Sequence, residues 1–222
     1  IIAGLETADE GEVIFGRGIR TAFLPQNPEF PDGAKVLSYV TEGKHDPDGG
    51  EPVSEAKTIL TKLGICDFEE TVDHLSGGQK KRVALARTLV DPADVLILDE
   101  PTSGLDPLMQ NRFIDLVAEE KKQGKTILMS SHMFEEVERT CDRIGIIRTG
   151  RMVAVDAAAA LRERHTRSYT VTLENESAAE VFAADFNGVR DGLKVTVTTK
   201  QSLEEIFMNY YGGEKHDEHG AV

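Results

Sequence analysis

Two adjacent carboxylates, Asp99 and Glu100, directly follow a run of apolar residues at 95–98. In a parallel sheet the carboxyl ends of the strands form the edge where ligands bind, so a buried strand that ends in acids places them there. Asp99 is suited to hold Mg²⁺, directly or through water, and Glu100 could accept a proton from a water molecule that attacks a phosphoryl group. A strand that ends in a solvated acidic turn has the same pattern, so the pair alone leaves both interpretations open.

The segment at 73–82, DHLSGGQKKR, combines glycines and basic residues at the start of a predicted helix. Ser76 precedes two glycines, which let a backbone approach a ligand closely, and the free N–H groups of a helix start attract phosphate. Two glycines in a first helical turn cost roughly 1 kcal/mol each against alanine. The basic residues at 80–82 stand at the unfavourable end of the helix dipole, and a bound anion would relieve this. An ordinary serine cap and a solvated basic face are the structural alternatives.

Hydrophobic periodicity divides most of the chain into alternating strands and helices. This alternation predicts an α/β fold in which helices cover both faces of a parallel sheet. The predicted strands lie at 12–15, 19–25, 94–98, 125–131 and 143–148, and the predicted helices at 34–43, 54–64, 77–90, 107–123 and 133–141, with a loop at 44–52.

The C-terminal part differs in composition after about residue 161. Apolar and polar residues alternate in RSYTVTLE and LKVTVTT, as they do in half-exposed antiparallel strands. Short helices are predicted at 177–186 and 202–211. We therefore predict a small α+β appendage at 166–211 and a disordered tail at 212–222.

The composition narrows the functional class. The net charge of −14 argues against a nucleic-acid-binding protein, which usually carries a basic patch, so no nucleic-acid partner is expected. No apolar run approaches the length of about 20 residues that spans a bilayer, and no signal peptide opens the chain. Cys66 and Cys141 are the only cysteines and form no CxxC motif, which favours a reducing compartment over a thiolate metal site.

Four motifs stand in the order and spacing of an ABC-type ATPase: LSGGQ at 75–79, VLILDE at 95–100, SGLD at 103–106 and SSH at 130–132. From residue 1 to about 212 the chain resembles the nucleotide-binding subunit of an exporter-type ABC transporter. The resemblance implies a P-loop NTPase-like α/β domain at 1–165, with a helical subdomain at about 27–90.

The resemblance implies roles for four residues at the nucleotide. Glu100 would be the catalytic base, and His132 would be the switch histidine that touches the γ-phosphate. Gln26 would reach Mg²⁺ or the attacking water with its neutral amide, and Asp99 would act on Mg²⁺. Taken alone, Gln26 is an ordinary polar loop residue, and a single histidine after a strand is more often a surface or capping residue.

The resemblance also implies partners. ATP and Mg²⁺ would bind between two ATPase subunits, in a homodimer or a heterodimer, with Asp106 at the dimer contact. The dimer would drive a separate transmembrane permease from the cytoplasmic side, as a peripheral protein on the inner face of the cell membrane. The residues that would bind the γ-phosphate of ATP held by the opposite subunit are Leu75, Ser76, Gly77, Gly78 and Gln79.

The phosphate-binding loop of the family, GxxxxGK[ST], does not occur in these 222 residues. We expect it upstream of residue 1, so that these 222 residues would be inactive alone. A complete protein that has lost nucleotide binding is the alternative.

The N-terminal half also resembles the soluble translation-factor branch of ABC ATPases, which usually continues with NHLD after the shared LILDEPT segment. Here SGLDPLMQNRF and the C-terminal appendage resemble exporter-type subunits. A join inside LILDEPT would account for both resemblances. The alternative function is a ribosome-associated ATPase or a non-catalytic relative; the single set of motifs and the acidic charge favour the exporter.

Overall fold

A computed structural model describes residues 1–44 and 52–212. Most of the loop predicted at 44–52 and of the tail predicted at 212–222 therefore lies outside the described residues. The chain forms two compact units, Ile1–Glu136 and Val137–Val222, which are described separately below.

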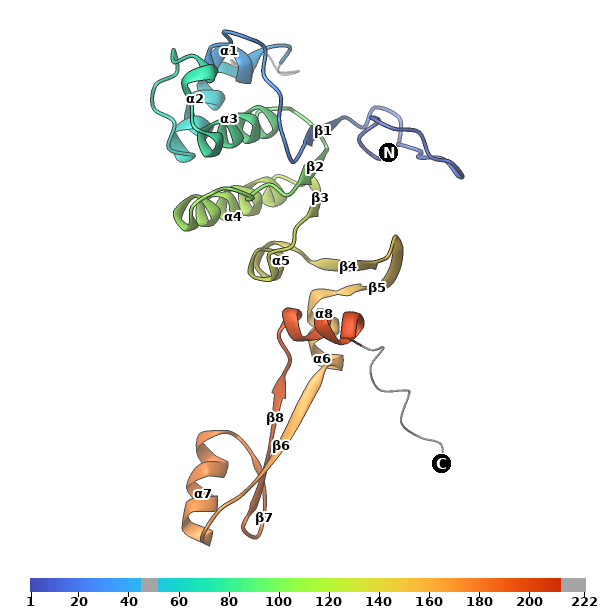
Figure 1. Ribbon diagram of the computed structural model, residues 1–222, viewed down its shortest axis with the longest axis vertical. Coiled ribbons are helices and arrows are strands. Elements are labelled where there is room, and N and C mark those ends of the chain that lie inside the picture. The colour runs from blue at the N-terminus through green and yellow to red at the C-terminus, as the bar shows by residue number, and fades with distance from the viewer. Residues whose placement is uncertain (45–51, 213–222) are drawn as a thin grey trace. The chain divides into compact units, whose positions relative to one another are not determined.

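Unit 1 contains a parallel sheet of three strands in the order β1-β2-β3 (Figure 1). The strands are β1 (Thr21–Leu24), β2 (Val95–Asp99) and β3 (Thr126–Ser130). β2 is central although it follows β1 by some 70 residues, because the helical subdomain is inserted between them. It contains most of the segment in which we placed a join, a hypothesis that stays a prediction.

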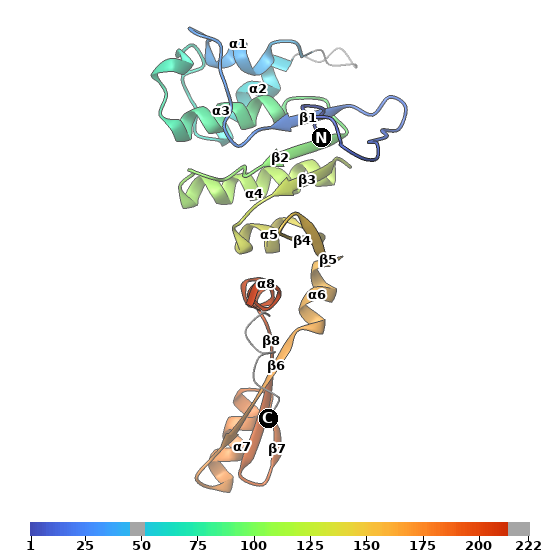
Figure 2. The ribbon, with the colours of Figure 1, turned by 45° about the vertical axis from the view of Figure 1, so that its right-hand side comes forward.

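The helical subdomain consists of α1 (Val36–Thr41), α2 (Pro52–Lys62), the short 3₁₀ helix η1 (Val72–His74) and α3 (Gly77–Leu89). The helices α1, α2 and α3 contact one another, and α3 also contacts β1 (Figure 2). The amphipathic spacing that predicted these helices is thus explained by packing within the subdomain and against the sheet.

Helix α4 (Pro107–Lys122) follows β2 and contributes the largest fully buried side chain of unit 1, Phe113. Phe113 belongs to one apolar cluster with Leu96 and Leu98 of β2. On the opposite face of the sheet Leu128 is 47% exposed. The prediction that helices cover both faces is therefore wrong at β3 in the part of the chain that the structure describes.

One predicted strand is absent, and another is a strand but lies outside the parallel sheet. Residues 12–15 form no strand and are exposed, because no neighbouring described strand pairs with them. Residues 143–148 form a strand, β4 (Arg143–Arg148), but it pairs antiparallel with β5 (Arg151–Ala157) in a separate two-stranded sheet. The turn between them has positive φ angles at Thr149 (47°) and Gly150 (75°), which suit a tight two-residue hairpin turn.

Unit 2 contains further elements after the β4–β5 hairpin. Besides α5 (Phe134–Thr140), which crosses the unit boundary, they are α6 (Ala158–Arg164), β6 (Thr166–Thr172), α7 (Glu176–Asp185), β7 (Val189–Asp191), β8 (Lys194–Lys200) and α8 (Leu203–Gly212).

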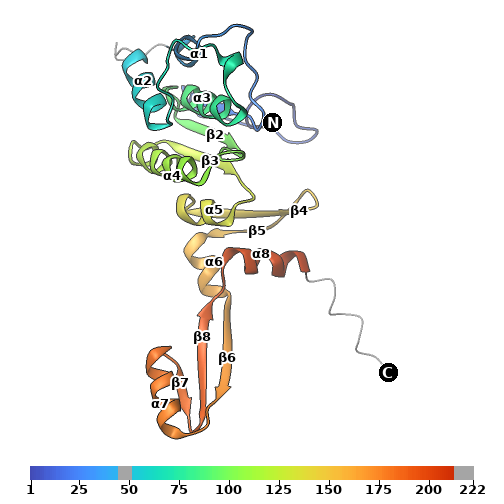
Figure 3. The ribbon, with the colours of Figure 1, turned by 60° about the vertical axis from the view of Figure 1, so that its left-hand side comes forward.

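The second sheet of unit 2 is antiparallel, in the order β6-β8-β7, with α7 packed on β7 and β8 (Figure 3). The alternating pattern thus predicted antiparallel strands correctly, whereas β5, α6 and β7 were not predicted. The unit begins at residue 137, earlier than our boundary at 166, because β4 pairs with β5 and not with the parallel sheet.

Replacement of Phe113 by alanine should destabilise unit 1, because it leaves a cavity in the apolar cluster. We expect a loss of about 3–5 kcal/mol in the free energy of unfolding, measured by urea denaturation. Leu108→Ala on the same helix is the matched control, since Leu108 is 62% exposed and should change stability by no more than about 0.5 kcal/mol. Equal losses for the two variants would contradict the assigned core.

Candidate functional site

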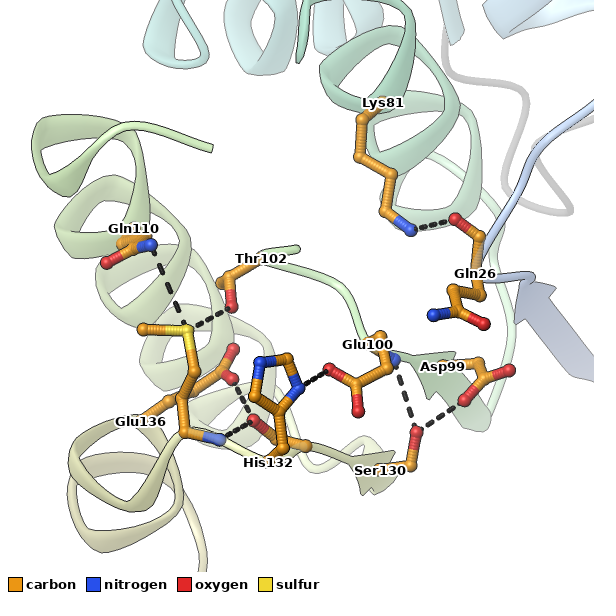
Figure 4. A network of polar contacts seen from close by, with 11 residues as sticks. Gln26, Lys81, Asp99, Glu100, Thr102, Gln110, Ser130, His132 and Glu136 are labelled. Carbon is orange, nitrogen blue, oxygen red and sulfur yellow. Dashed lines mark hydrogen bonds and ion pairs between the residues drawn. The ribbon is translucent and has the colours of Figure 1, made fainter. Parts of the chain in front are cut away.

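The two acids at the end of the central strand lie in different environments. Asp99 is the last residue of β2, and its Oδ1 accepts a hydrogen bond of 2.5 Å from Ser130 Oγ on β3. Glu100 has a left-handed backbone conformation with φ 47°, which is uncommon for a residue other than glycine. Its N–H donates to the Ser130 carbonyl at 3.2 Å and to the Ser130 hydroxyl at 3.1 Å, and Figure 4 marks the contact with the hydroxyl. Strand β3 therefore holds the backbone turn that separates the two carboxylates.

His132 lies against Glu100 although the two residues are 32 positions apart. Its Nδ1 is 2.6 Å from Glu100 Oε2, and Figure 4 shows the imidazole and the carboxylate facing each other. The His132 side chain is 72% exposed, whereas that of Glu100 is 20% exposed. The structure thus brings together Glu100, the predicted base, and His132, the predicted switch histidine. The contact uses Nδ1 of the imidazole and does not involve Nε2.

Lys81, in the second turn of α3, lies beside the same edge of the sheet. It is only 5% exposed, and its Nζ donates to the backbone carbonyl of Gln26 at 2.5 Å and to that of Pro25 at 3.3 Å. Burial lowers the pKa of Lys81, while the nearby carboxylates of Asp99 and Glu100 raise it. The sequence suggested an external anion for these basic residues; within the chain, Lys81 already donates to two backbone carbonyls and lies near the carboxylates of Asp99 and Glu100.

The backbone carbonyl of Gln26 accepts the hydrogen bond from Lys81, which attaches the Gln26 loop to α3. Its carboxamide extends from that contact toward the Asp99 end of β2 in Figure 4. The arrangement places a neutral amide on the loop that follows β1, next to the acids that follow β2. The contribution of Lys81 was not predicted, because its burial depends on the packing of α3 against β1.

Ser76 and Gln79 form the start of α3. Ser76 Oγ accepts from the Gln79 N–H at 3.3 Å, and Gln79 Oε1 accepts from the Ser76 N–H at 2.9 Å, which is a capping box. Leu75 precedes this cap and ends η1. The ordinary capping role of Ser76 is therefore present, and it does not explain the glycines that follow.

The two glycines of this segment differ in their surroundings. A Cβ on Gly78 would lie 3.2 Å from the carbonyl oxygen of Gly104, so a glycine lets α3 approach the segment at 103–106 closely. A Cβ on Gly77 would meet nothing within 4 Å. Nothing within the described chain requires a glycine at 77, although it costs about 1 kcal/mol of helix stability against alanine.

Asp106 begins α4 as its N-cap, since its Oδ1 accepts from the Met109 N–H at 3.1 Å. It lies in the segment that Gly78 approaches. The hydrogen bonds and ion pairs described above for Glu100, His132 and Lys81 do not involve Asp106. The predicted site residues therefore form two groups, one at the end of β2 and one at the start of α3.

A buried acid behind His132 was not predicted. Glu136 is 3% exposed, and its Oε2 accepts a hydrogen bond of 2.5 Å from Ser131 Oγ, which in turn accepts from the Met133 N–H at 3.0 Å. Burial raises the pKa of Glu136, and hydrogen bonds from Ser131 and Thr102 oppose this shift. These contacts hold the backbone on both sides of His132. The sequence offered no signal, since Glu136 stands among other helical acids.

Mg²⁺ is usually held by one or two carboxylates together with phosphate oxygens. Asp99, the Ser130 hydroxyl and the Gln26 amide supply oxygen donors of this kind at the sheet edge. No group of three or more histidine, cysteine, aspartate or glutamate side chains able to hold a metal occurs among the described residues. The donor set fits an ion that is bound jointly with a nucleotide.

The ABC transporter family matches residues 1–103. The Nod factor export ATP-binding protein I of Burkholderia orbicola is 52% identical over 141 residues, covering 61% of this chain and 42% of that protein. The chain carries an ABC transporter ATP-binding domain. The resemblance drawn from the four motifs is thereby confirmed.

Two further relatives come from Bacillus subtilis. The linearmycin resistance ATP-binding protein LnrL is 32% identical over 149 residues, covering 67% of this chain and 48% of its own length. The uncharacterized ABC transporter ATP-binding protein YfmR is 37% identical over 143 residues, covering 48% and 23%. The chain spans less than half the length of each of these three relatives.

Solved structures agree with the α/β fold. An ATP-binding subunit of an ABC transporter superposes with a TM-score of 0.58 at 23% identity, covering 65% of this chain and 62% of that one. A bacterial Atm1-family ABC exporter with ATP bound gives 0.55 at 22% identity, covering 65% and 26%. At these identities the likeness confirms the fold class of an ABC ATPase and nothing finer.

The raised pKa of Glu136 predicts how stability changes with pH. The folded state holds the proton more tightly than the unfolded state, so stability falls as pH rises from the ordinary value of 4.5 through the raised pKa. Glu136→Gln removes this loss. The variant should be more stable than the parent above that interval, and the gain should shrink as pH falls through the interval toward 4.5.

Urea denaturation of parent and variant between pH 4 and 8 measures this difference. Glu135→Gln, on an exposed neighbour in α5, is the matched control for the loss of one carboxylate from the same helix. A pH-independent difference for Glu136→Gln would refute the assigned cause.

Proposed function

We propose that the chain is the ATP-binding subunit of an exporter-type ABC transporter, which binds and hydrolyses ATP at an interface with a second ATPase subunit. The observation that carries this proposal is the 2.6 Å contact between Glu100 and His132 at the end of the central strand, beside Asp99. A base, a polarising imidazole and an oxygen ligand for Mg²⁺ then converge on one point, as phosphoryl transfer to water requires.

Glu100 accepts the proton of the attacking water in this proposal. Its carboxylate is oriented by His132 Nδ1, and its backbone by the two hydrogen bonds to Ser130. Orientation matters because a general base must lie within hydrogen-bond reach of the proton that it removes. The exposed face of His132 offers its second nitrogen to the γ-phosphate.

Asp99 and Gln26 would hold Mg²⁺, which when bound neutralises charge on the phosphate groups. Lys81 contributes by position: it ties the backbone of Gln26 to α3, the helix that begins with the LSGGQ segment. A displacement of the Gln26 loop by a membrane partner would therefore act on α3 directly. This offers a route by which a permease could influence the signature segment.

The signature segment, residues 75–79, would bind the γ-phosphate of ATP held by the opposite subunit. Gly77 supports this role, because its backbone is open and no neighbour in the described chain accounts for the glycine. The N–H groups at a helix start attract phosphate, and a side chain at 77 would obstruct the approach. Asp106 would lie at the same dimer contact. Homodimer and heterodimer both satisfy this arrangement.

The direction of transport is proposed from the relatives, whose names refer to Nod factor export and linearmycin resistance. The permease would select the substrate. No helix among residues 1–44 and 52–212 is both long and apolar enough to cross a membrane. We propose that the subunit acts as a peripheral protein on the cytoplasmic face of the cell membrane. The three relatives described above give no support to the ribosomal alternative.

The role of Glu100 is tested by Glu100→Gln in a chain joined to a family segment that carries GxxxxGK[ST]. The substitution removes the proton acceptor and keeps the size of the side chain, so ATP binding should persist while turnover falls by at least about 100-fold. Phosphate release and nucleotide titration measure the two quantities. Glu119→Gln on the surface of α4 is the control and should retain the parent rate. A Glu100→Gln variant with parent turnover would refute the base assignment.

The 222-residue chain by itself should bind Mg-ATP only weakly. Its nucleotide edge carries the acids Asp99 and Glu100, and the nearby cation Lys81 already donates to backbone carbonyls. Without a phosphate cradle, several charge-assisted hydrogen bonds worth roughly 1.5–3 kcal/mol each are missing. Isothermal titration calorimetry should detect no binding in the micromolar range. A micromolar dissociation constant would mean that another part of the chain binds the phosphates.

A further inference from the structure

Strand β6 (Thr166–Thr172) forms one edge of the antiparallel sheet of unit 2. It pairs with β8 over its whole length without a register shift, and all its residues are exposed. Figure 3 shows β6 and β8 as a long two-stranded ladder, with β7 and α7 at its far end. No other described strand pairs with the outer side of β6.

The hydrogen bonds at the two ends of this ladder identify which backbone groups point outward. The Gln201 N–H donates to the His165 carbonyl at 2.9 Å, and the Leu173 N–H donates to the Leu193 carbonyl at 2.8 Å. Hydrogen-bonded and non-hydrogen-bonded pairs alternate along an antiparallel ladder. The odd-numbered residues of β6 therefore bond to β8, and the even-numbered ones direct their N–H and C=O groups to the open edge.

Side-chain contacts agree with this assignment. Ser168 Oγ lies 2.9 Å from Thr198 Oγ1, and Thr170 Oγ1 lies 3.0 Å from Thr196 Oγ1. Side chains approach each other more closely in non-hydrogen-bonded pairs. Both contacts fall at even-numbered positions of β6, as the backbone alternation requires.

The β6 edge also lacks the features that normally prevent strand pairing. Natural edge strands are kept apart by short length, charges, proline or a bulge. β7, the opposite edge, is only three residues long and ends in Asp191. The β4–β5 hairpin has a register shift between Ile146 and Ile147. β6 has seven residues, no proline, no register shift, and Arg167 as its single charge.

We propose that β6 is an interaction surface for a second copy of this chain, and that the two β6 strands pair antiparallel about a two-fold axis at Tyr169. In this register Ser168 lies opposite Thr170 of the second copy, and Thr166 opposite Thr172. The even-numbered residues thus form the hydrogen-bonded pairs, so every outward N–H and C=O between 166 and 172 meets a partner. The two three-stranded sheets join into one continuous sheet.

The side chains are compatible with this pairing. Tyr169 is 50% exposed and stands opposite its own copy, and aromatic pairs across strands are favourable. Arg167 stands opposite Val171 of the second copy, so no like charges oppose each other directly. The pairing needs no nucleotide, which separates it from the ATP-dependent contact proposed above.

Cysteine cross-linking tests the register in the 222-residue chain, with Cys66 and Cys141 replaced by serine and no nucleotide present. Tyr169→Cys places two cysteines on the axis in a non-hydrogen-bonded pair, with Cα atoms about 4.5 Å apart, within the range of a disulfide. Val171→Cys is the matched control, because its copies would be about 14 Å apart along the strands.

Mild oxidation should convert most of the Tyr169→Cys chain to a disulfide dimer on a non-reducing gel and leave the Val171→Cys chain monomeric. Equal cross-linking of the two variants, or none in either, would overturn the proposal.

Sedimentation equilibrium provides a second measurement that needs no new cysteine. Ser168→Pro removes an outward N–H and leaves the β8 ladder intact, a position where edge strands tolerate proline. It should weaken the dimer at least tenfold, whereas Ser168→Ala, which keeps the N–H, should not. Circular dichroism verifies that both variants are folded. A proline variant that dimerises like the parent would also overturn the proposal, and a parent that remains monomeric at all concentrations would do the same.

Discussion

The parallel pairing of β2 between β1 and β3 is the constraint on which the site in unit 1 depends. Leu96 and Leu98 enter the apolar cluster, and the same register places Asp99 opposite Ser130. Because side chains alternate along a strand, a slip by one residue would turn these leucines away from the core. Burial of the leucines therefore fixes the strand register, and with it the position of Asp99 and Glu100 at the end of the sheet.

The buried Lys81 is a second consequence of this packing. Taking an ammonium group out of water is costly unless other groups replace its hydration. Two backbone carbonyls do so here, and the nearby carboxylates of Asp99 and Glu100 favour the charged form. One cation thereby connects two segments that are far apart in the sequence, the loop after β1 and the helix α3, and it lies within electrostatic reach of the acids at the end of β2. Electrostatics and packing support each other at this point.

Unit 2 differs from unit 1 in the type of its sheets. Its strands β6, β8 and β7 are antiparallel and close in sequence, and Val195 of β8 and Ala179 of α7 are fully buried. Threonine and serine pairs across β6 and β8 replace apolar contacts on part of the sheet. Such a sheet can expose one edge, and pairing with another strand would satisfy that edge without rearrangement of the fold.

The sequence by itself determined the elements whose signals are local. Hydrophobic periodicity predicted α3, α4 and β2, and motif spacing predicted the family and the candidate residues Glu100 and His132. Only the tertiary structure decided which of these meet, because a contact between Glu100 and His132 requires β2 and β3 to be neighbours. The burial of Lys81 and Glu136, and the pairing of β4 with β5, likewise depend on long-range packing or on turn geometry. A lysine or glutamate on a helix has the same local sequence pattern whether water or protein surrounds it. The neighbouring residues in the sequence therefore could not reveal that Lys81 and Glu136 are buried.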